Sequence, residues 1–295
     1  MNFSNIQSAL DDSDRRLLAR ADELRSRAAG GVPAFSGFLS PREVYILTAF
    51  GFETKCRRSE LAMQDTIGFF WGGYSDAERK IYISLPGFAA YSLPERNNCV
   101  ESEDESFSPC ELSRLASDEL PAHISRLLIK KSGYVTLSHR DYMGALLGLG
   151  IERDHIGDII LVDEGAVVFA EPGIANFLKN SLSEVGRDHV KVFDAPELEL
   201  VRSFENVTGT VASARLDTVV SELSNCSRET AKELIRRGLV EHDYFPAADA
   251  DAEVISGDVI SIRREGRVKG GKFVIDSIGT LTSKGRVRFL ARRYI

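Results

Sequence analysis

The chain has 295 residues, of which 43% are hydrophobic and 27% charged, a composition typical of a globular protein with two or three domains. No apolar run approaches the ~20 residues of a membrane span, and the first residues lack the basic and then apolar layout of a signal peptide, so we expect a cytoplasmic protein without membrane insertion. The four cysteines form no C-x-x-C pair and have no histidine at ligand spacing. This argues against a zinc site or a disulfide framework, and no cofactor is expected.

Charge is distributed unevenly along the chain. The net charge is −7, but the segment from Ser213 onward carries 15 basic and 12 acidic residues. Within residues 262–295, ten Lys or Arg face only Glu265 and Asp276. An acidic chain with a basic C-terminal segment indicates that one domain binds a polyanion, most often nucleic acid.

The first 75 residues are expected to be mainly helical. Apolar residues recur at helical spacing over residues 3–28, and a second helix is predicted to begin at Ser40, with Pro41 as its first residue and Glu43 completing a capping box. The Gly-rich aromatic segment 69–74 then separates this region from a predicted strand at 80–85. We therefore expect a domain boundary near residue 75.

Residues 76–208 are predicted to form a second domain. The pattern predicts, in order, strand 123–130, helix 140–149, strands 158–162 and 166–170, helix 173–184 and strand 189–193. This β-α-β-β-α-β order is that of the ferredoxin-like or RNA-recognition-motif topology. Neither central strand has the basic and aromatic run of an RNA-stacking motif, which favours a scaffold or protein-contact role. The acidic segment 97–112 is interpreted as a solvated insertion that would repel phosphate.

The third expected domain, residues 209–295, begins with two short helices. A helix over 228–237 places Arg228, Lys232 and Arg236 in one stripe. The apolar residues of the two helices can form a shared core: Leu216, Val219, Val220, Leu223, Ala231, Leu234 and Ile235. The stripe alone is equally consistent with an ordinary solvated helix face.

Short motifs in this segment agree in type and spacing over about 48 positions with an S4-like RNA-binding domain, which the chain therefore resembles. The matching residues are Arg215-Leu216-Asp217, Ser227-Arg228 with Ala231, Ile235 with Gly238 and Val240, and Gly257-Asp258. The chain departs from the pattern at His242-Asp243-Tyr244, where Val-Asn-Gly is usual. The resemblance implies an α+β chain that ends in an S4-like domain with a basic C-terminal hairpin.

Further motifs extend the resemblance over nearly the whole chain, to the YlmH family of bacterial S4-domain proteins. They are FLSPRE (38–43), GGYSDAERK (72–80), LSHRDYMGALLGLGIERDHIGDI (137–159), GRVKGGKF (266–273) and KGRVRF (284–289). The resemblance implies a cytosolic factor that binds the large ribosomal subunit. Members of that family are associated with ribosome quality control, where they help hold peptidyl-tRNA, and with cell division.

Such a role needs cations at phosphate spacing on a rigid frame and no catalytic group. The expected contacts to rRNA and tRNA are Arg215, Ser227, Arg228, Lys232, Arg236, Arg237, Arg263, Arg264, Arg267 and Lys269. We interpret Asp217 as a partner that orients Arg228 within this surface, rather than as a metal ligand. Arg237 points away from the stripe.

Two other classes remain open. Arg215-Leu216-Asp217-Thr218 resembles the segment around the nucleophile of pseudouridine synthases, but only 78 residues follow Asp217, fewer than their catalytic domain needs. His139 is better explained as a helix-entry residue than as an acid–base catalyst. A division-linked adaptor with protein partners on the N-terminal and central domains, and only secondary RNA binding, is the third class.

Overall fold

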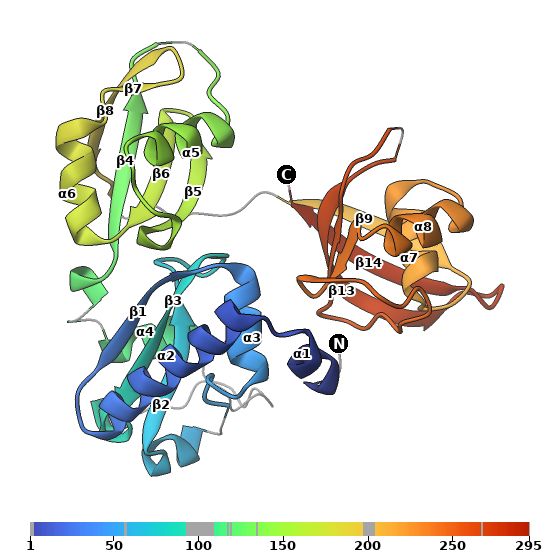
Figure 1. Ribbon diagram of the computed structural model, residues 1–295, viewed down its shortest axis with the longest axis horizontal. Helices are drawn as coiled ribbons and strands as arrows, with labels where there is room; N and C mark the ends of the chain where they lie inside the picture. The colour runs from blue at the N-terminus through green and yellow to red at the C-terminus, as the bar shows by residue number, and fades with distance from the viewer. Residues whose placement is uncertain are drawn as a thin grey trace. The chain divides into compact units, whose positions relative to one another are not determined.

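The computed structural model describes residues 3–55, 58–92, 109–116, 118, 120–133, 135–196, 204–266 and 268–294. The chain divides into two compact units, Leu10–Val201 and a second that combines Met1–Ala9 with Arg202–Ile295. Helices and strands occur in both, as the α+β class requires (Figure 1). Within the described ranges, no helix has the length and apolar character of a membrane span. The short elements are α1 (Phe3–Ala9), η1 (Arg58–Met63), η2 (Gly87–Ser92), α4 (Pro109–Ser113), η3 (Arg114–Ala116), η4 (Leu120–Ala122) and η5 (Arg153–His155).

The larger unit begins with a three-stranded antiparallel sheet in the order β1-β3-β2. Its elements are α2 (Asp12–Ala29), β1 (Ala34–Leu39), α3 (Pro41–Ala49), β2 (Thr66–Trp71) and β3 (Lys80–Pro86). Helix α2 packs on the sheet through a cluster that includes Ala21, Phe70 and Tyr82 (Figure 1). The predicted start of α3 is confirmed: Ser40 caps it, Pro41 opens it, and the side chain of Glu43 accepts from the Ser40 N–H at 2.7 Å.

Three expectations for this region need correction. Helices do make up most of the first 75 residues, but the strands β1 and β2 were missed: both are short, largely apolar strands without the alternation that marks a half-buried strand. The boundary expected near residue 75 falls between β2 and β3, which pair directly. The helix predicted over residues 3–28 is also divided, because Asp11 caps α2 by accepting from the N–H groups of Ser13 and Asp14.

The second sheet of this unit has the predicted order of elements, except that the helix expected to reach residue 184 ends at Ser181 and a short strand follows at Glu184–Val185. Its elements are β4 (Ser125–Lys131), α5 (His139–Gly148), β5 (Ile156–Val162), β6 (Gly165–Ala170), α6 (Pro172–Ser181), β7 (Glu184–Val185) and β8 (Asp188–Asp194). The strands pair in the order β5-β6-β4-β8-β7. Helices α5 and α6 bury one face through residues such as Tyr142, Leu146 and Leu178 (Figure 1). The acidic segment 97–112 lies mostly outside the described residues.

A buried polar link joins the two sheets of this unit. The Arg79 side chain donates to three backbone carbonyls, those of Phe38, Arg153 and Ile156, at 2.8–2.9 Å. Asp158 in turn accepts from the Tyr74 hydroxyl at 2.6 Å and from the Arg79 N–H at 3.1 Å. Burial lowers the pKa of Arg79 to about 10, so the guanidinium stays charged at neutral pH. The two sheets also share an apolar cluster, which makes residues 10–201 one packed body.

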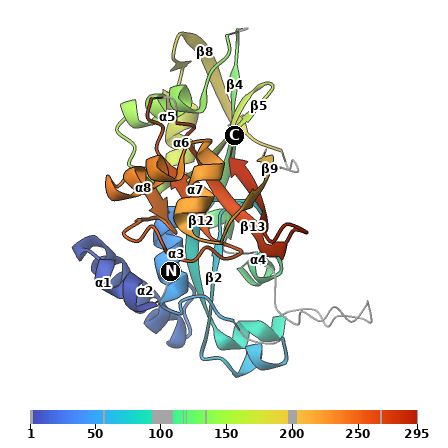
Figure 2. The ribbon, with the colours of Figure 1, turned by 90° about the vertical axis from the view of Figure 1, so that its right-hand side faces the viewer.

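The C-terminal unit is a six-stranded antiparallel sheet in the order β11-β10-β12-β13-β14-β9, with two helices on one face (Figures 1 and 2). Its elements are β9 (Phe204–Val211), α7 (Leu216–Ser224), α8 (Arg228–Arg236), β10 (Val240–His242), β11 (Phe245–Pro246), β12 (Val259–Ile262), β13 (Gly271–Leu281) and β14 (Val287–Tyr294). The predicted helix pair, its apolar core and the strand at 259–262 are confirmed. β9 begins before the expected boundary at residue 209 and pairs with β14 over its whole length.

Candidate nucleic-acid interface

The centre of the candidate surface is a buried carboxylate. Asp217, in the first turn of α7, is 0% exposed, and its Oδ2 accepts from the Nε of Arg228 at 2.8 Å. The Nε of Arg215 lies 3.4 Å from Oδ1 and the Nζ of Lys232 lies 3.9 Å from Oδ2. Three expected contact residues are therefore gathered around one acid, and Asp217 has the Arg228 partner that the sequence predicted.

The ionisation of Asp217 follows from these neighbours. Burial raises the pKa of the carboxyl, but the hydrogen bond and charge of Arg228, together with Arg215, outweigh burial and lower the pKa below its usual value. Asp217 is therefore an anion at neutral pH, with its oxygens directed to side-chain cations. Such an acid fixes the positions of Arg228 and Lys232, whose side chains remain 47% and 43% exposed.

Local backbone geometry holds these residues in place. Asn225 ends α7 in the left-handed conformation at φ 50°, and Ser227 caps α8 by accepting from the Thr230 N–H at 3.1 Å. Ser227 is thus a structural cap in addition to an expected contact. Gly238 follows α8 with φ 68°, as its position after the helix predicted.

The expected stripe along α8 is not a row of equivalent cations. Arg236 forms a bidentate pair with Glu233 at 2.7–2.9 Å, and Arg237 pairs with Glu265 at 2.5 and 2.8 Å. Arg215 also pairs with Asp251. Helical periodicity places Glu233 beside Arg236, but it could not show Asp251 or Glu265 as partners, because both are distant in sequence. Through Glu265, Arg237 links the end of α8 to the loop that follows β12.

That loop, residues 263–270, brings further positive charge beside the helix pair. The N–H of Arg263 donates to the carbonyl of Leu239 at 2.8 Å, and the N–H of Lys269 donates to the carbonyl of Ser224 at 3.3 Å. The side chains of Arg263, Arg264 and Lys269 are exposed, and within the described part of the chain no ion pair neutralises them. Arg267 lies outside the described residues. We call Arg228, Lys232, Arg263, Arg264 and Lys269 the cationic face.

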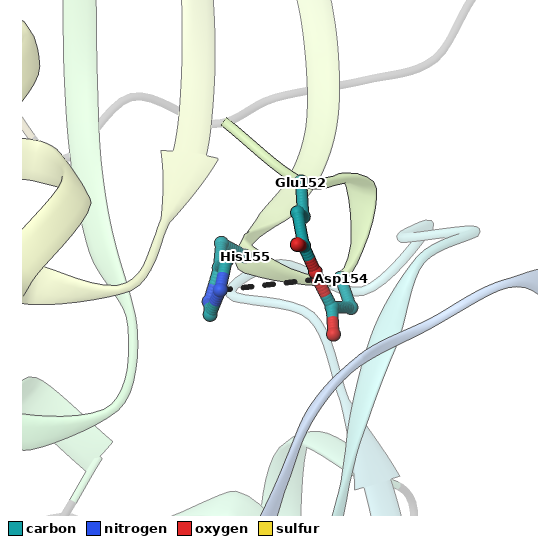
Figure 3. Close-up of side chains that lie close together, drawn as sticks. All are labelled: Glu152, Asp154 and His155. Carbon is teal, nitrogen blue, oxygen red and sulfur yellow. Dashed lines mark ion pairs between the residues drawn. The ribbon is translucent and has the colours of Figure 1, made fainter. Parts of the chain in front are cut away.

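Among the described residues, two clusters have the residue types of metal ligands. Glu152, Asp154 and His155 meet at η5 (Figure 3), where His155 Nδ1 lies 2.8 Å from the Oε2 of Glu171. This hydrogen bond is the main reason that the pKa of His155 is raised, and it accounts for the position of the ring. The arrangement is explained without a metal ligand set.

The second cluster, His242, Asp243 and Asp258, is buried at the turn between β10 and β11. His242 Nε2 lies 2.7 Å from Asp258 Oδ2, and Asp258 also accepts from the Ile255 N–H. Asp243 accepts from the Val259 N–H at 3.0 Å. This is the place where the sequence departs from Val-Asn-Gly, and the polar side chains fix the turn internally.

Comparison with known proteins gives three results. The family model described as "Putative RNA-binding domain in YlmH" matches residues 127–199. The chain is 30% identical over 234 residues to "Ribosome-associated protein quality control protein P2" of Bacillus subtilis (strain 168), an alignment that covers 78% of this chain and 77% of the relative. A solved structure, "Cell division protein ylmH from Streptococcus pneumoniae", is 18% identical with a TM-score of 0.41 and covers 63% of this chain and 93% of its own.

The family model lies within the larger unit, and the printed names of the family model and of the relative refer to RNA and to the ribosome. The chain belongs to the YlmH family. The matching family model lies on the central sheet, in the segment that the sequence had assigned to scaffolding because it lacks a stacking motif. The absence of a stacking motif is therefore not an argument against RNA binding by that segment.

Proposed function

We propose that this protein is a non-catalytic RNA-binding factor that holds structured rRNA or tRNA on the large ribosomal subunit through its cationic face. The observation that carries the proposal is the exposure of Arg263, Arg264 and Lys269 beside Arg228 and Lys232, on a frame that a buried carboxylate and two backbone hydrogen bonds fix. Structured RNA is read through phosphates, 2′-hydroxyls and shape, which such a frame suits. The name of the Bacillus subtilis relative supports a ribosomal site.

The central sheet is proposed as a second, weaker contact. Lys130 and Lys191 are directly opposite each other on β4 and β8, and Phe193, which is 47% exposed, lies on the same face two residues along the strand. Two amines beside an exposed ring are suited to a phosphate and a base. The family model that matches residues 127–199 supports this placement.

The test uses the full-length chain and purified large subunits. The triple substitution Lys232→Ala, Arg264→Ala and Lys269→Ala should weaken the affinity for the large subunit, measured by co-sedimentation, about 100-fold. The reason is that each charge-assisted hydrogen bond to a phosphate contributes roughly 1 kcal/mol. These side chains are at least partly exposed and lie outside the apolar core, so the melting temperature should change little.

The matched control removes three exposed cations from α2: Arg16→Ala, Arg20→Ala and Arg27→Ala. This control should sediment like the wild type. Equal sedimentation of the two triple variants would show that the cationic face does not bind the ribosome.

A further inference from the structure

A second group of cations and aromatic rings lies within the C-terminal sheet. The Nζ of Lys272 is 5.1 Å from the ring centre of Tyr244 and 4.6 Å from that of Tyr294. Tyr294 is in edge-to-face contact with Phe204 at 5.1 Å, and the guanidinium of Arg292 lies 5.0 Å from the Phe204 ring. These five residues, which we call the aromatic row, form a chain of contacts between rings and cations that joins strands distant in sequence.

The aromatic row lies on the face opposite to the helices. Phe273 on β13, and Phe289 and Ala291 on β14, are buried in the cluster that α7 and α8 cover. Because successive side chains of a strand point to opposite faces, Lys272, Arg292 and Tyr294 lie on the other side. Tyr294 pairs with Phe204 across β14 and β9, so the ring of Phe204 belongs to that face too. The cationic face and the aromatic row are therefore separate surfaces of one domain.

The turn that presents Tyr244 is held in an unusual conformation. Asp243 and Tyr244 have φ angles of 52° and 67°, as in the hairpin turns that normally contain Asn-Gly. An aromatic residue at positive φ costs about 1 kcal/mol or more. The turn is locked by backbone and side-chain hydrogen bonds between Asp243 and Val259. A strained tyrosine at a position suited to glycine indicates a use for the ring.

The rings and cations of the aromatic row indicate which ligand it can bind. Partly exposed aromatic rings stack on nucleobases of any sequence, and neighbouring Lys and Arg side chains contact the phosphates. The exposed Arg288 lies on the same face as Lys272 and Arg292. Two acids share this face: Asp276, which pairs with Arg292 at 2.8 Å, and Glu241, which the strand register places in line with Lys272. The balance of charge is positive, which favours an anionic strand over an acidic or neutral surface.

We propose that the aromatic row binds a single-stranded RNA segment, with bases stacked on Tyr244, Tyr294 and Phe204. The inference rests on the proposed function, because both assign RNA binding to the same domain. It adds a single-stranded segment on the sheet face, whereas the cationic face binds structured RNA. Lys272 and Arg292 hold the backbone of that segment. Structured RNA on the cationic face and an unpaired strand on the sheet can thus be bound together.

The test measures fluorescence anisotropy of a labelled ten-nucleotide oligouridylate with the full-length chain. Tyr244→Gly removes the ring and supplies the residue that positive φ favours, so it should not lower the melting temperature. We expect this variant to bind the oligonucleotide about 5- to 150-fold more weakly, the scale of removing one base–aromatic stack. Tyr294→Leu should have a similar effect. Tyr91→Leu, a tyrosine that is 77% exposed in the other unit, should have none.

Large-subunit sedimentation distinguishes this inference from the proposed function. Tyr244→Gly should retain subunit binding while the triple substitution in the cationic face loses it. If wild type, Tyr244→Gly and Tyr294→Leu bind oligouridylate equally, or if wild type does not bind it, the inference is overturned whatever the subunit result. The row would then serve only packing or a protein partner.

Discussion

At the scale of single residues, Arg228 both packs and presents charge. It is an expected RNA contact outside the apolar core, and it is also the closest partner of a fully buried carboxylate. Removing one member of such a pair leaves the other charge poorly compensated. Effects of Arg228 substitutions on RNA binding must therefore be separated from effects on stability.

We predict that Arg228→Ala lowers the free energy of unfolding of the C-terminal unit by about 1–3 kcal/mol, because Asp217 loses its shortest hydrogen bond. The double variant Asp217→Asn with Arg228→Ala should recover part of this loss, because it removes the buried charge. Thermal melts of both variants at neutral pH give the comparison. An unchanged melting temperature for Arg228→Ala would contradict the prediction.

The pH of that measurement matters. Since the folded pKa of Asp217 is lowered, its ion pairs contribute stability that is fully present above the ordinary pKa of 3.8 and lost as pH falls through the folded value. At neutral pH the pair is therefore intact. Arg20→Ala, an exposed cation on α2, is the control for loss of a helical arginine.

At the scale of elements, two glycines of the larger unit differ in the space around them. Gly68 lies in β2, where an added Cβ would be 2.1 Å from the backbone carbonyl of Phe52. Gly144 lies inside α5, where an added Cβ would meet nothing within 4 Å. Both have ordinary φ angles, so only packing distinguishes them.

We predict opposite effects of the same substitution at these two positions. Gly68→Ala should destabilise by about 1–3 kcal/mol, since backbone must move to admit the methyl group. Gly144→Ala should stabilise by about 0.5–1 kcal/mol, because alanine is the better helix former. Urea denaturation of each variant measures both. Destabilisation by Gly144→Ala would contradict this prediction and would show that a methyl group at position 144 does meet other atoms.

Local signals predicted the elements that depend on local chemistry. The capping box of α3, the neighbouring strands β5 and β6, and the helix α8 were placed from residues within a few positions of one another. β1 and β2 were missed because their apolar runs become strands only by pairing with β3. The aromatic row was missed for the same reason: Phe204 and Tyr294 are neighbours through strand register, although period-2 alternation of Arg288, Arg292 and Tyr294 was visible.

At the scale of the whole molecule, the uneven charge should govern how binding responds to salt. Affinity for nucleic acid falls with salt with a log–log slope of roughly −0.7 to −0.9 per phosphate neutralised. We predict that the triple substitution in the cationic face makes this slope shallower by about 2–3 for the large subunit. Filter binding across a salt series measures it, and parallel slopes for the variant and wild type would show that these cations neutralise no phosphate.

The buried Arg79 link has a practical consequence for dissecting the protein. A fragment that ends between the two sheets of the larger unit would keep the guanidinium but lose the carbonyls of Arg153 and Ile156 and the carboxylate of Asp158. The apolar residues shared by the sheets would be exposed in the same cut. Truncations intended to separate activities should therefore preserve residues 10–201 as one piece, even though the family model covers only its last part.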